Sequence, residues 1–102
     1  MSEEMDFLTL EQLCSVYSLE RDWLVVRVRE GLIPALGDED ARGDHASSDH
    51  TTWRFATTAL ARVRRMHEIE RSYDAAPELA ALVADMLEEM DALRARLRRE
   101  GL

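Results

Sequence analysis

Lysine is absent from this chain of 102 residues, all 13 basic residues are arginine, and cysteine occurs once. A single cysteine excludes a disulfide bond within the chain and is typical of a reducing compartment, where we expect Cys14 to act as a small buried apolar side chain. No apolar run approaches the roughly 20 residues that span a membrane, and the acidic start MSEEMD does not resemble a signal peptide. These absences predict a cytoplasmic protein.

Recognisable catalytic motifs are also missing. The chain has no Gly-rich phosphate loop, no H-E-x-x-H and no G-x-S-x-G, and adjacent carboxylates such as Glu88 and Glu89 are typical of a solvated helix face. His45, Asp49 and His50 are possible metal ligands, but no cysteine and no fixed scaffold accompanies them, which favours a solvated loop. We therefore expect a protein without enzymatic activity, cofactor or bound metal.

Charge is present in blocks of opposite sign. Residues 1–50 carry 12 acids and 4 arginines, a net −8, and residues 51–71 carry 5 arginines and 2 acids, a net +3. Residues 72–93 carry 6 acids and no base, a net −6, and residues 94–102 carry 4 arginines and 1 acid, a net +3. The N-terminal half would repel phosphate, which argues against a nucleic-acid partner.

Two short helices are predicted near the N-terminus. Thr9 stands three residues before Gln12, which is the spacing of a capping box, and apolar residues then follow at helical spacing over residues 10–17. Ser18 is a suitable N-cap for a second helix that ends at Gly31, because Pro34 prevents its continuation. Two short helices joined by a tight turn predict a helix-turn-helix.

The middle of the chain is predicted to be a loop followed by a strand. Residues 35–51 lack apolar periodicity and are rich in Gly, Asp and Ser, whereas TTWRF has the composition of a short strand. We expect this strand to pair with the segment LIPAL, residues 32–36, across the loop. A third helix is then expected to begin at Thr57 or Thr58, and a fourth to cover about residues 76–99, with Pro77 in its first turn.

The fourth helix has the apolar spacing of a coiled coil. Its seam residues repeat at alternating intervals of three and four, and they are Val83, Met86, Met90, Leu93 and Leu97. Leu79, Leu82 and Leu87 are expected to widen this stripe toward the body of the domain. The stripe predicts either packing within the chain or a homodimer of antiparallel helices, in which Glu89 would contact Arg96 of the second copy.

The order of these elements resembles that of MerR-like proteins. The segments LTLEQLCSVYSLERDWLVVRVREGLIPAL and TTWRFATTALARVRRMHEIERSYDAAPELAALVADMLEEMDALRARLRREG look like the parts before and after the wing in that family. Cys14, EGLIP, TWRF and the tail AALVADMLEEMDALRARLRRE resemble, more narrowly, the CbpM chaperone-modulator family. The resemblance covers about residues 7–100, although the loop looks longer and more acidic than the usual wing.

This resemblance implies a mainly α fold. The expected architecture is a MerR-like winged helix-turn-helix with a short β-hairpin wing and a C-terminal coiled-coil helix. Residues 1–74 would form the helix-turn-helix domain, with an acidic wing loop at 35–52, and residues 75–102 would form the dimerisation helix.

It also implies a function. Members of the family bind a DnaJ/CbpA-type co-chaperone and inhibit its work with Hsp70, and the co-chaperone's J-domain presents a basic helix to the Hsp70. Candidate partner-binding residues in this chain are Glu11, Glu20, Asp22 and Trp23, although Trp23 is equally compatible with core burial. The alternative is a MerR-type DNA-binding transcriptional regulator, whose phosphate contacts would come from the arginines Arg27, Arg29, Arg54, Arg62, Arg64 and Arg65. An adaptor for an unrelated partner is a third possibility.

Overall fold

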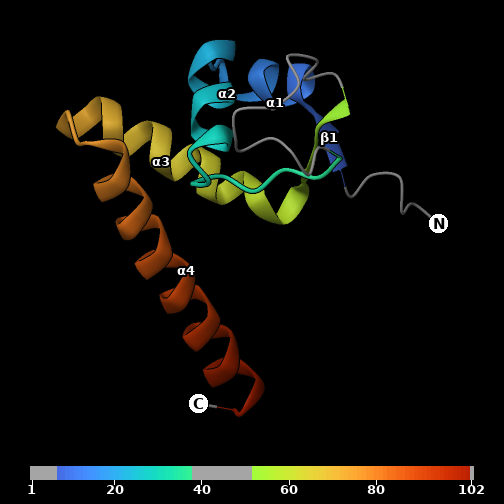
Figure 1. Ribbon diagram of the computed structural model, residues 1–102. Coiled ribbons are helices and arrows are strands. Elements are labelled where there is room, and N and C mark those ends of the chain that lie inside the picture. The colour runs from blue at the N-terminus through green and yellow to red at the C-terminus, as the bar shows by residue number, and fades with distance from the viewer. Residues whose placement is uncertain (1–6, 38–51, 102) are drawn as a thin grey trace. The chain divides into compact units, whose positions relative to one another are not determined.

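The computed structural model describes residues 7–37 and 52–101, and this part of the chain is mainly helical (Figure 1). The helices are α1 (Leu10–Tyr17), α2 (Arg21–Arg29), α3 (Leu60–Tyr73) and α4 (Pro77–Arg99), with a 3-10 turn, η3 (Thr57–Ala59), directly before α3. Two strands, β1 (Phe7–Thr9) and β2 (Arg54–Ala56), form an antiparallel sheet. The chain divides into two compact units, Met1–Arg64 and Arg65–Leu102.

The first helix has the predicted bounds and the predicted cap. The backbone amide of Gln12 donates to the Thr9 hydroxyl over 3.1 Å, and the backbone amide of Thr9 donates to the side-chain oxygen Oε1 of Gln12 over 2.9 Å. This reciprocal pair satisfies amide groups that the first turn of a helix leaves without partners. The expectation for Ser18 was wrong, since Ser18 ends α1 in a left-handed conformation, with φ of 55°, and does not start the next helix.

The second helix instead begins after Glu20, which is its N-cap residue and makes no side-chain capping bond. Its end agrees with the sequence, because Gly31 follows the last turn with φ of 79°, a conformation that glycine adopts without strain. The Leu32 amide donates to the Arg27 carbonyl over 3.0 Å at this end of the helix. The chain then leaves the helix before Pro34.

The sheet differs from the prediction. The strand at Arg54–Ala56 exists, but it pairs with Phe7–Thr9, and Leu8 lies opposite Phe55. The expected pairing with residues 32–36 is reduced to one bridge, in which Leu36 and Arg54 exchange backbone hydrogen bonds of 2.8 Å. Pro34 has no amide hydrogen, which prevents a longer ladder along this segment.

The core of the first unit is built from side chains of α1, α2, β2, the beginning of α3 and the residues that flank these elements. Trp53 and Phe55 are fully buried and meet edge to face, with ring centroids 6.3 Å apart. The other large side chains of this unit that are fully buried are Leu10, Leu13, Leu24, Ile33 and Val63. No polar or charged residue is buried within the described ranges. Apolar burial is therefore the main stabilising contribution here.

The second unit comprises the end of α3 and all of α4, because the division between the units falls inside α3. Pro77 occupies the first turn of α4, as predicted, and the helix runs without interruption to Arg99. The buried face of α4 is made of Ala80, Ala81 and Ala84. None of the helices within 7–37 and 52–101 is long and apolar enough to cross a membrane.

Candidate interaction surfaces

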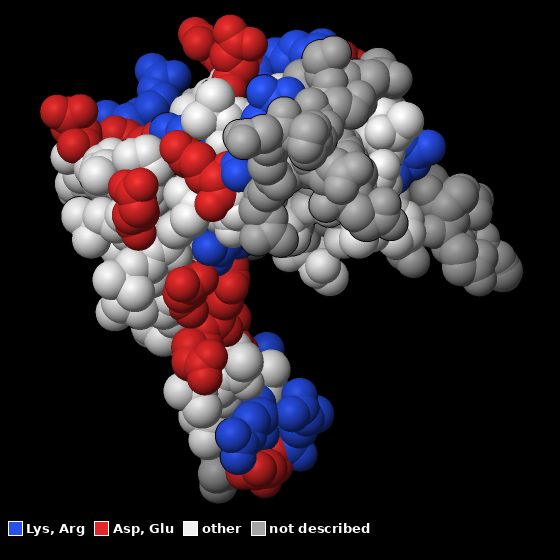
Figure 2. All heavy atoms as spheres, in the orientation of Figure 1, with Lys and Arg blue, Asp and Glu red and all other residues white. Residues whose placement is uncertain are grey.

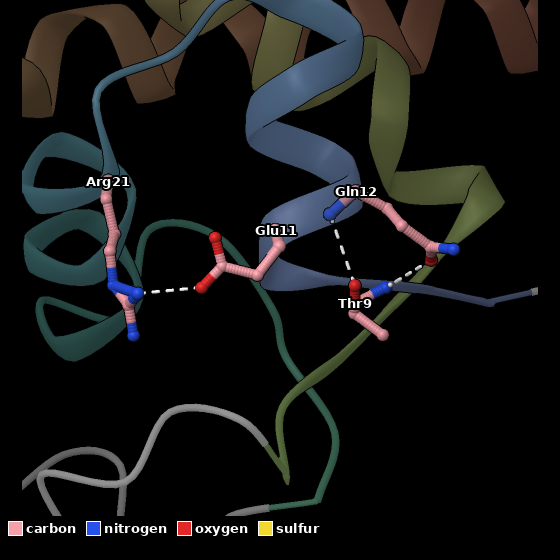
Figure 3. Close-up of polar contacts among 4 residues, drawn as sticks. All are labelled: Thr9, Glu11, Gln12 and Arg21. Atoms are coloured by element: carbon pink, nitrogen blue, oxygen red, sulfur yellow. Dashed lines mark hydrogen bonds and ion pairs between the residues drawn. The ribbon is translucent and has the colours of Figure 1, made fainter.

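An acidic cluster surrounds the start of α2. The capping box holds the first turn of α1, and Glu11 in that turn reaches Arg21, the first residue of α2, with 2.7 Å between carboxylate oxygen and guanidinium nitrogen (Figure 3). Both side chains are exposed, so this ion pair is worth at most about 1 kcal/mol. Its consequence is positional, because it brings Glu11 to the end of α2 that carries two more carboxylates.

Those two carboxylates belong to Glu20 and Asp22, which flank Arg21 and are both exposed. Asp22 stands in the first turn of α2, where the positive end of the helix dipole favours an anion. Together with Glu11 they form what we name the acidic cluster: three carboxylates and one guanidinium, a net charge of −2. The ion pair therefore places Glu11 beside Arg21, which Glu20 and Asp22 flank in the sequence.

Trp23 has a different environment. It is half-buried, and the guanidinium carbon of Arg27 lies 5.3 Å from the centre of its ring, which is cation–π distance. Arg27 also reaches Glu30, with 3.4 Å between nitrogen and carboxylate oxygen. Trp23 is thus neither a fully buried core residue nor an open aromatic face, because Arg27 covers part of its ring.

The arginines that a DNA-binding surface would use are largely engaged within the protein. Arg62 donates from Nε to the Leu32 carbonyl over 2.7 Å, which fixes α3 to the turn after α2. Arg54 donates to the carbonyls of Thr52 and Trp53, over 3.2 and 3.4 Å. Arg65 pairs with Asp91 at 2.8 Å. These side chains would have to exchange protein partners for phosphate before they could bind a nucleic acid.

The seam residues expected on α4 lie on its accessible side. Met86, Met90, Leu93 and Leu97 are between 43% and 57% exposed, and Val83 is half-buried. Of the three leucines expected toward the body of the domain, Leu87 is half-buried, but the expectation for Leu79 and Leu82 was wrong. Both are more than half exposed, and the small alanines Ala80, Ala81 and Ala84 are buried instead. Leu79 continues the seam, because its distance of four residues to Val83 extends the alternation; that signal was present in the sequence.

Figure 2 shows the charges along α4. Acidic side chains occupy the middle of this helix and arginines its C-terminal part, in agreement with the acids at 85–91 and the arginines at 94–99. Glu89 and Arg96 are both exposed. The helix therefore combines an accessible apolar stripe with two charge blocks of opposite sign.

Cys14 lies half-buried near the end of α1. Burial raises the pKa of its thiol, the negative charge of Glu11 raises it further, and the positive charge of Arg21 lowers it. A raised pKa keeps the thiol protonated at neutral pH, and the protonated form is a poor nucleophile. The position is that of a packing residue, although it is less buried than we expected.

Within the described ranges, no three His, Cys, Asp or Glu side chains are grouped closely enough to hold a metal ion. The possible ligands His45, Asp49 and His50 lie outside those ranges. No family model, curated protein or solved structure matches this chain. The geometry of the acidic cluster and of α4 therefore carries the functional argument, together with the resemblance of the motifs.

Proposed function

We propose that this protein is a non-enzymatic modulator that binds the J-domain of a DnaJ/CbpA-type co-chaperone and inhibits its work with Hsp70. The observation that carries the proposal is the acidic cluster, in which Glu11, Glu20 and Asp22 gather around the start of α2. A basic J-domain helix is complementary to this surface in charge. Such complementarity speeds encounter and selects the correct partner more than it adds affinity.

The arrangement of the first unit supports this proposal. Two short helices, α1 and α2, are joined by residues 18–20, and a strand follows the segment 38–51. We propose that these elements are a MerR-like winged helix-turn-helix in which residues 35–52 correspond to the wing. The scaffold would then present protein-binding carboxylates where related folds present DNA-binding groups, since one fold can host unrelated functions.

The DNA-binding alternative receives less support from the contacts. Arg21 and Arg27 on α2 are paired with Glu11 and Glu30. Arg54, Arg62 and Arg65 donate to backbone carbonyls or to a carboxylate of the same chain. Affinity for DNA depends on arginine and lysine side chains that neutralise phosphates, and the acidic cluster, with its net charge of −2 at the start of α2, would oppose them.

A binding titration tests the proposal. The purified J-domain of the co-chaperone encoded in the same genome is titrated with this protein by calorimetry, and the Hsp70 ATPase rate that the J-domain stimulates is measured in parallel. We expect binding that weakens with added salt, and a lower stimulated rate. The variant Glu20→Gln/Asp22→Asn removes two of the three carboxylates, and we expect it to weaken binding roughly tenfold, or about 1.4 kcal/mol.

The matched control is Glu100→Gln, which removes one exposed carboxylate at the far end of α4 and should leave the affinity unchanged. Absence of any binding at low salt contradicts the proposal. A mobility-shift assay with the protein's own upstream DNA tests the alternative. A specific shift that disappears steeply with salt would favour the transcriptional regulator.

A further inference from the structure

No further inference is drawn: the strongest candidate, the exposed patch of Arg94, Arg96, Arg98 and Arg99 at the C-terminal end of α4, complements the negative end of the dipole of its own helix, and nothing in the structure shows which partner would cover it.

Discussion

The guanidinium of Arg65 on α3 donates a hydrogen bond of 2.8 Å to the carboxylate of Asp91 on α4, 26 residues further along the chain. The Arg65 side chain is only 19% exposed, and within the described residues its Nη1 atom is buried without a hydrogen-bond partner. Asp91 is also 3.9 Å from Arg94. One carboxylate therefore compensates most of the charge of a largely buried guanidinium.

Removal of the Asp91 carboxylate should destabilise the fold. We expect Asp91→Ala to lower the free energy of unfolding by about 1–3 kcal/mol, because it leaves the Arg65 charge largely buried and unpaired. Urea unfolding at one fixed protein concentration measures the change. The double variant Arg65→Met/Asp91→Ala should recover part of the loss, since it removes both charges. Equal instability of the single and double variants would contradict this account.

The capping box at Thr9 gives a second prediction. Thr9→Ala removes the hydroxyl that accepts the Gln12 amide at 3.1 Å, so one amide of the first turn loses its partner. We expect the free energy of unfolding to fall by about 1 kcal/mol, as is usual for the loss of an N-cap. Thr9→Ser keeps a hydroxyl at the same place and should retain most of the stability. A loss as large for serine as for alanine would mean that the methyl group, and not the cap, is responsible.

Gly37 and Gly101 form a matched pair of glycines with positive φ, of 94° and 80°. A β-carbon at Gly37 would lie 2.3 Å from the carbonyl oxygen of Thr52, whereas one at Gly101 meets nothing within 4 Å. Both alanine variants carry the cost of a left-handed conformation, about 1 kcal/mol, but only Gly37→Ala forces the backbone apart. We expect Gly37→Ala to be the less stable in thermal unfolding. Equal stabilities of the two variants would show that the backbone at Gly37 and Thr52 moves apart without a loss of free energy.

The raised pKa of the Cys14 thiol predicts how its alkylation rate and the stability of the protein depend on pH. Burial and the charge of Glu11 raise its pKa, so the inflection of its alkylation rate against pH should lie above that of a free cysteine. Because the folded-state pKa exceeds the unfolded one, the free energy of unfolding is unaffected below the unfolded pKa and falls as pH rises through the folded pKa.

The charge of Glu11 can be tested separately. Glu11→Gln removes a negative charge that raises the pKa, so the alkylation inflection should move to lower pH. Glu20→Gln, a similar exposed carboxamide substitution that does not act on Cys14, should leave it in place. A shift to higher pH in Glu11→Gln would contradict the assigned cause.

The helices were predictable because their signals are local. Thr9 and Gln12 determine the start of α1, Gly31 and Pro34 determine the end of α2, and Pro77 determines the start of α4, each through backbone groups within a few residues. The acidic cluster was predictable in composition for the same reason, since Glu20 and Asp22 are close in sequence. The family resemblance, the J-domain partner and the antiparallel dimer remain predictions.

Tertiary structure decided what depends on distant segments. The strand at Arg54–Ala56 was evident from its residues, but its partner Phe7–Thr9 was not, because a strand of three residues carries little information about what it pairs with. The sequence also could not assign the faces of α4. Leu79 and Leu82 were expected to widen the apolar stripe toward the body of the domain. The structure buries Ala80, Ala81 and Ala84 and leaves the leucines accessible, since burial follows from which face the rest of the fold covers.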